Sequence, residues 1–92
     1  MIVRIMGEGQ FRLEAHELDH LNELDNLVVE AVGKNDDAGF KSLFGQLLDY
    51  VRAQGDEVPD AELATSDVIL PASNLSLAEA RSLFAGEGLV PG

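Results

Sequence analysis

The sequence contains no cysteine and no tryptophan, and it has only one tyrosine and three prolines among its 92 residues. Without cysteine, neither a disulfide scaffold nor a thiolate metal site is available. Basic residues are scarce as well, because six Lys and Arg face 17 Asp and Glu and leave a net charge of −11. Such a charge repels phosphate backbones and anionic lipid headgroups, so we expect no direct binding to nucleic acids or membranes.

Long hydrophobic runs are also missing from the sequence. No apolar N-terminal stretch has the length of a signal peptide or a transmembrane span, which makes the cytoplasm the expected location. The composition itself, 46% hydrophobic and 25% charged, is typical of a globular chain. A chain of this length supports one modest core, so we expect a single domain over residues 1–92.

The opening stretch MIVRIMGEGQFRL predicts a β-hairpin. If Gly7–Gly9 form a three-residue loop with the last glycine in the left-handed conformation, Ile5 faces Phe11 and Val3 faces Leu13. This register collects four apolar side chains on one face of the hairpin. A two-residue loop would mix apolar and charged side chains on each face, so the pattern favours the longer loop.

The spacing of apolar residues then changes to the three- and four-residue steps of a helix. It predicts one helix over Ala15–Gly33 and a second over Asp37–Gln54, with Gly55 as a stop signal. Because only the short segment KNDD separates them, the two helices are expected to form an antiparallel αα-hairpin. The residues expected in the core between the helices and the hairpin are Leu21, Val28, Phe44, Leu47 and Leu48.

The last third of the sequence gives weaker signals. The acidic stretch DEVPDAELATSD is typical of a turn, and the following VILP could be a third strand of the sheet. Ser76 and Glu79 have the spacing of a capping box, which predicts a short helix. The fold class is therefore α+β: an N-terminal β-hairpin, or a three-stranded antiparallel sheet, packed on a long αα-hairpin with a short C-terminal helix. The side chains of that last helix expected to point inward are Leu77, Ala80, Leu83 and Phe84.

The segment HELDH matches the H-E-x-x-H signature of zinc proteases. On a helix, His16 and His20 share one face and could bind an ion, with Glu17 as the base. The chain has no third histidine, however, and is too short for the two lobes that normally enclose such a site. We interpret the two histidines as residues at the border between the apolar face and water. The sequence predicts no catalytic residue, no cofactor and no metal.

Two features point instead to protein binding. In the predicted hairpin Arg4 and Arg12 face each other, which is unfavourable unless the chain's own carboxylates or a partner's carboxylate lie close by. The first long helix carries an apolar arc of about 200° between Leu27 and Val29, wider than one neighbouring element usually covers. That helix is either central to the core or binds a partner. Candidate partner-binding residues are Arg4, Arg12, Leu18 and Val29.

Three segments resemble the family of PspA-associated proteins, which are small acidic proteins named for their association with phage shock protein A. They are MIVRIMGEGQFRL, LNELDNLVVEAV and SDVILPASNLSLAEARSLFAGEGLVPG, so the resemblance covers nearly the whole chain. The opening segment and the final EGLVPG are the most specific parts. The resemblance implies a single PspA-associated domain and a non-enzymatic accessory of the envelope-stress system, with no catalytic or cofactor-binding residues to transfer.

From the residues and the resemblance together, we expect direct binding to a PspA-like coiled-coil protein. That partner would bring the cytoplasmic protein to the inner face of the cell membrane. Two alternatives stay open: a small zinc-dependent hydrolase that uses HELDH, and an acidic protein that mimics nucleic acid. The sequence leaves open whether the chain forms a homo-oligomer.

Overall fold

Three helices and four short strands are present in residues 1–59 and 65–83, the part of the chain that the computed structural model describes. The predicted α+β class is confirmed, and both long helices begin and end at the predicted residues. In chain order the elements are β1 (Ile2–Ile5), β2 (Gly9–Arg12), α1 (Ala15–Gly33), α2 (Asp37–Gln54), β3 (Asp56–Val58), β4 (Val68–Leu70) and α3 (Leu77–Leu83).

The sheet has the strand order β3-β2-β1-β4, with β4 parallel to β1 and the other neighbours antiparallel. The VILP segment is thus a strand, but the expected three-stranded antiparallel sheet is wrong, as is the expectation of a turn throughout DEVPDAELATSD. After α2, β3 pairs with β2 at one edge of the sheet, and β4 then pairs with β1 at the opposite edge. Asp67 fixes β4 there, since its backbone N–H donates to the Ile2 carbonyl and its Oδ2 accepts from the Ile2 N–H, both at 2.8 Å.

The hairpin turn starts earlier in the chain than the sequence predicted. The backbone N–H of Glu8 donates to the carbonyl oxygen of Ile5 at 3.0 Å, which places Met6 and Gly7 at the centre of the turn. Gly7 has a φ of 84° and Gly9 a φ of 135°. Only glycine adopts such values without strain, so both glycines of the GEG segment are required by the backbone.

As a result, the pairing of β1 with β2 is shifted by two residues from the predicted register. Arg4 lies opposite Gln10, and Arg12 lies opposite Ile2, so the predicted direct pairing of the two arginines is wrong. A shift of two residues leaves each side chain on its predicted face, because side chains alternate along a strand. Val3 accordingly remains on the core face and is buried.

Local hydrogen bonds define both ends of the αα-hairpin. Glu14 and Glu17 form a capping box at the start of α1, in which the Glu14 N–H donates to Glu17 Oε1 at 2.9 Å. Asp36 caps α2, because its Oδ1 accepts from the Gly39 N–H at 3.0 Å. Between the helices Asn35 adopts a φ of 58°, a left-handed conformation that asparagine tolerates well. The reversal therefore needs only three residues.

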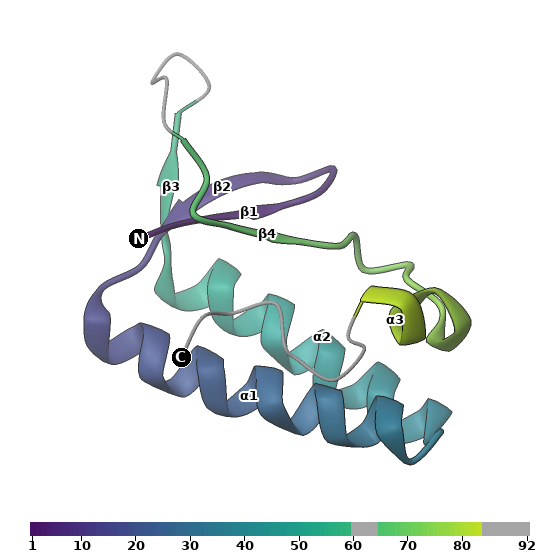
Figure 1. Ribbon diagram of the computed structural model, residues 1–92. Helices are drawn as coiled ribbons and strands as arrows, with labels where there is room; N and C mark the ends of the chain where they lie inside the picture. Colours follow the sequence, from purple (N-terminus) through teal and green to yellow (C-terminus); the bar gives the residue numbers. More distant parts are fainter. Residues whose placement is uncertain (60–64, 84–92) are drawn as a thin grey trace.

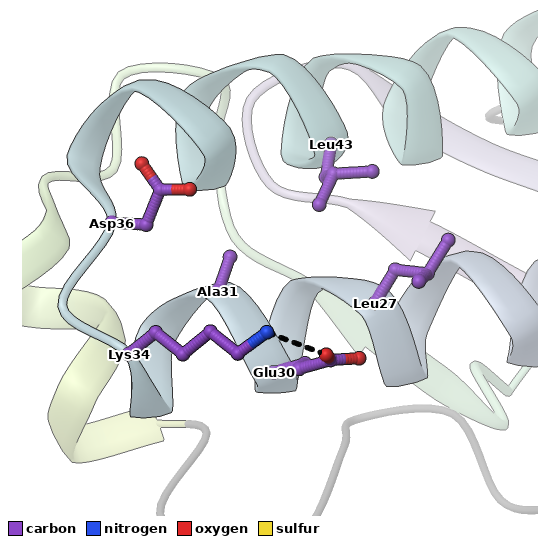
Figure 2. A pocket seen from close by; sticks show the side chains of 6 residues that line it. All are labelled: Leu27, Glu30, Ala31, Lys34, Asp36 and Leu43. Carbon is purple, nitrogen blue, oxygen red and sulfur yellow. Dashed lines mark hydrogen bonds and ion pairs between the residues drawn. The ribbon is translucent and has the colours of Figure 1, made fainter.

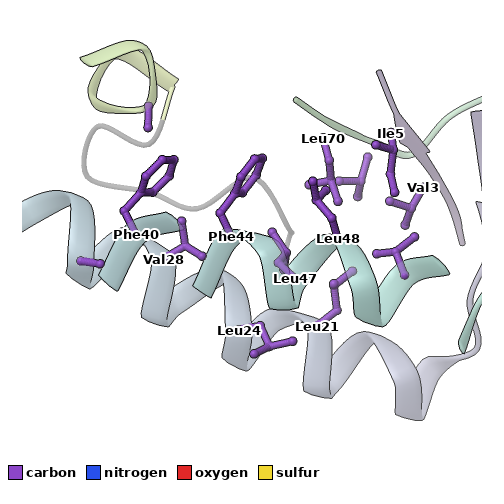
Figure 3. Packing of buried hydrophobic residues seen from close by; sticks show 14 of the residues in the cluster. Val3, Ile5, Leu21, Leu24, Val28, Phe40, Phe44, Leu47, Leu48 and Leu70 are labelled. Atoms are coloured by element: carbon purple, nitrogen blue, oxygen red, sulfur yellow. The ribbon is translucent and has the colours of Figure 1, made fainter. Parts of the chain in front are cut away.

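Both long helices cover one face of the sheet, with α2 nearer to the sheet than α1 (Figure 1). Figure 3 shows Leu48 of α2 pointing toward Ile5 and Leu70 of the sheet, while Leu21 of α1 lies against α2 from the other side. This three-layered arrangement makes α2 the central helix, which explains why five of its large apolar residues are buried: Phe40, Phe44, Leu47, Leu48 and Val51. The five predicted core residues are confirmed as buried: Leu21, Val28, Phe44, Leu47 and Leu48.

An ion pair ties the hairpin turn to α2. The Arg52 guanidinium donates to both carboxylate oxygens of Glu8, each at 2.6 Å, and also to Asp49 Oδ1 at 2.7 Å. The hydrogen bond from Arg52 lowers the pKa of Glu8 below its usual value. This bidentate contact holds the turn over the C-terminal half of α2.

The short helix α3 begins with the predicted capping box. The Ser76 N–H donates to Glu79 Oε1 at 3.1 Å, and the Glu79 N–H donates to Ser76 Oγ at 3.2 Å. Ala80 is buried and Leu77 half-buried, as expected, but the inward orientation predicted for Leu83 is wrong because this side chain is 47% exposed. A helix of seven residues has room for only a narrow buried stripe. Phe84 lies outside the described residues.

Candidate protein-binding surfaces

The two histidines of HELDH contact different neighbours. His16 Nδ1 lies 3.5 Å from Glu14 Oε2, and its side chain is 76% exposed. His20 Nδ1 lies 3.6 Å from Glu23 Oε2, and its ring packs at 4.6 Å between centroids against Tyr50 of α2. The two imidazoles therefore make separate contacts on the surface of α1.

One group of potential metal ligands occurs in the described part of the chain, formed by Glu14, His16 and Glu17. It contains only one of the two histidines, so it differs from the zinc-protease arrangement. The Glu17 carboxylate already accepts a capping hydrogen bond. Glu14 and Glu17 lie close together because they form the capping box of α1. This geometry gives no support to the hydrolase alternative.

Arg4 and Arg12 lie on the outer face of the sheet, the face directed away from the helices. Arg4 Nε donates to Ser66 Oγ at 3.4 Å, and Gln10 Nε2 donates to the same hydroxyl at 2.7 Å. Arg12 lies opposite Asp56 of β3, an opposite-charge pair across the strands. The sheet itself thus places an acidic residue beside Arg12, while both arginines remain exposed.

Leu18 and Val29 lie on α1, and α2 lies between this helix and the sheet (Figure 1). The outer face of the sheet, which carries the two arginines, is directed away from both helices. Both are half-buried and packed against the core. The four predicted partner-binding residues therefore do not form one surface. Leu27, on the other flank of the helix, is 44% exposed and offers more apolar area than either.

An open pocket of about 150 Å³ lies between the C-terminal half of α1 and the start of α2. Figure 2 shows Leu27 and Leu43 projecting from the two helices, with Ala31 farther along α1. The Lys34 ammonium donates to Glu30 Oε1 at 2.8 Å along the rim. We call this surface the helical groove, and its residues are Leu27, Glu30, Ala31, Lys34, Asp36 and Leu43.

Nearer the start of α1, seven residues before Leu27, His20 contacts Tyr50 of α2. Tyr50 is half-buried, and its pKa is raised by burial and by the nearby charge of Glu17. The residues named here are apolar, aromatic or charged, and none forms a pair of nucleophile and base. The surface is suited to binding another apolar surface rather than to catalysis.

Sequence reasoning missed the helical groove, although one signal was present. Leu27 was placed at the edge of the apolar arc, and an edge leucine is exposed when the neighbouring helix contacts only the centre of that arc. The position of Leu43 opposite Leu27 depends on how the two helices align, which helix periodicity alone does not determine.

Within residues 1–59 and 65–83, no helix combines the length and the hydropathy needed to cross a bilayer. Comparison with curated proteins and with solved structures found no match. A family model does match, namely PspAA, described as PspA-associated protein, and the match extends over residues 1–92. The full-length match agrees with the resemblance seen in the three sequence segments, and the chain belongs to the PspA-associated protein family.

Proposed function

We propose that this protein is a non-enzymatic accessory of the envelope-stress response that binds a PspA-like coiled-coil protein directly. The observation that carries the proposal is the family match over all 92 residues, because the family is named for this association. The surfaces described above support it. They offer exposed apolar and charged side chains without a catalytic constellation.

We further propose that the protein reaches the membrane only through this partner. A net charge of −11 opposes adsorption to anionic bilayers, so the membrane affinity has to come from the partner. Among the predicted contact residues, Arg4 and Arg12 remain candidates for a charged contact because both are exposed. Leu18 and Val29 offer less surface, since both are half-buried.

Liposome flotation tests the proposal. Anionic vesicles are floated with the protein alone, with the protein and its cognate PspA-like partner, and with an Arg4→Glu/Arg12→Glu variant plus partner. We expect the protein to float only when the partner is present. Flotation of the protein alone would contradict recruitment by the partner. If the partner floats with the vesicles and the protein does not, the proposed function is contradicted. Normal flotation of the variant would remove only the arginines from the contact.

A further inference from the structure

We propose that the helical groove binds one helix of the coiled-coil partner, with Leu27 and Leu43 contacting the apolar stripe of that helix. This inference rests on the proposed function and specifies where the contact lies and what chemistry it selects. A third helix placed along two antiparallel helices completes a three-helix bundle, a common packing of amphipathic helices. The occupant is therefore expected to be an amphipathic helix.

The apolar part of the groove has the shape for such a contact. Leu27 projects from α1 and Leu43 from α2, and Ala31 lies one helical turn after Leu27 (Figure 2). Ala31 is buried and small, so its side chain does not fill the groove beside the two leucines. A large apolar side chain of the partner can be inserted there without moving the backbone of either helix.

The length of the surface indicates how much of the partner is bound. From the ring contact at His20 to the rim at Lys34, α1 runs for 14 residues, or about 21 Å at the rise of an α-helix. A helix lying along this line with a small crossing angle would make contact over about two heptads. Such a contact is long enough to select the register of the partner helix.

The charge along the groove selects a basic partner. Carboxylates of Glu23, Glu30 and Asp36 lie along or beside it, and the single basic residue that lines it, Lys34, is already paired with Glu30. The complementary helix carries Lys or Arg beside its apolar stripe. The same charge disfavours a second copy of this chain, because two acidic grooves of a protein with a net charge of −11 would repel each other.

The outer face of the sheet is the competing surface, and its chemistry is opposite. Ile69 is 56% exposed there and lies beside Arg4 in the strand pairing. A partner bound on this face would carry carboxylates, whereas a partner bound in the helical groove carries basic residues. Substitutions at the two surfaces therefore distinguish the two modes of binding.

The test uses the full chain and the full-length cognate coiled-coil protein, with the dissociation constant measured by fluorescence anisotropy. Leu27→Gln should weaken binding by about tenfold or more, because it replaces an apolar contact at the centre of the groove. The matched control Ile69→Gln changes a residue of similar exposure on the sheet and should bind within about twofold of the native chain. Thermal melts establish that both variants fold.

A second arm reverses charge beside the helical groove. Glu23→Lys should weaken binding, and the dependence of its affinity on salt should be shallower than that of the native chain. Arg4→Glu/Arg12→Glu, which tests the separate arginine contact, should weaken binding less than Leu27→Gln or Glu23→Lys does. The inference is overturned if the sheet variants lose affinity while Leu27→Gln and Glu23→Lys keep it.

Spin labelling measures directly which surface contacts the partner. Because the chain has no cysteine, Leu27→Cys and Ile69→Cys each provide a single site for a nitroxide label. The label at position 27 should lose mobility when the partner is added, and the label at position 69 should not. Absence of binding by the native chain would reject the proposed function itself. A homodimer that Leu27→Gln dissociates would instead assign the helical groove to a second copy and overturn the inference.

Discussion

The junction between α2 and β3 allows the effect of one added methyl group to be worked out from the structure. Gly55 has an extended backbone, with φ −78° and ψ 147°, which any residue can adopt. If backbone conformation alone mattered, Gly55→Ala would stabilise the fold by about 0.4–1 kcal/mol through the unfolded chain. The packing reverses this sign. An added Cβ would lie 2.7 Å from the Val51 carbonyl oxygen and 2.8 Å from the Phe11 Cβ.

Neither of these atoms can move without its backbone, so the substitution has to displace α2 from β2. Overpacking of this kind costs about 1–3 kcal/mol. After the conformational gain is subtracted, we expect a net loss of about 0.6–2 kcal/mol in the free energy of unfolding. For a domain of this size that corresponds to a fall in Tm of roughly 2–16 °C. Differential scanning calorimetry measures the change.

Gly45 provides the matched control, inside the helix that ends just before Gly55. It lies in the middle of α2, where an added Cβ meets no atom within 4 Å. Gly45→Ala should therefore stabilise the protein by about 0.5–1 kcal/mol, the ordinary preference for alanine over glycine in a helix. If Gly55→Ala raised the Tm as Gly45→Ala does, the close contact at the α2–β3 junction would be refuted.

Three further substitutions test other parts of the structure. Leu47→Ala should cost about 2–5 kcal/mol in urea unfolding, because the fully buried side chain leaves a cavity between the layers. Arg52→Gln should cost about 0.5–1 kcal/mol near pH 7, and its deficit should narrow as the pH falls through the lowered pKa of Glu8, because protonation removes the ion pair from the native chain as well. His16→Ala/His20→Ala should change stability by about 0.5 kcal/mol at most, and elemental analysis should find no stoichiometric zinc in the native chain.

The helices were predictable because their ends carry local chemistry. The Asp36 cap of α2 and the Ser76–Glu79 capping box are each formed within four residues, so nearby sequence determines them. The core face of the hairpin was predictable for a related reason, since alternation survives a register shift of two residues. Local signals therefore recovered the elements and their buried faces.

The arrangement of the strands could not be recovered in the same way. In β3 only Val58 is buried, while Asp56 and Glu57 are exposed, so this strand shows no apolar alternation. The parallel direction of β4 depends on contacts with residues near the start of the chain, such as the Asp67–Ile2 hydrogen bonds. Likewise, the helical groove depends on the relative alignment of two helices. Each of these features is set by tertiary packing rather than by local sequence.

The parallel pairing of β4 with β1 has a consequence for the order of folding. Ile2 and Asp67 are 65 residues apart, so β1 completes its pairing only after the segment from β2 to β4 has also been synthesised. The αα-hairpin and the β-hairpin rest on contacts between near neighbours and can form earlier. Until β4 arrives, β1 presents an unpaired strand edge to other nascent chains. Synthesis that stalls before residue 68 would leave a partly folded chain with an open edge and a tendency to aggregate.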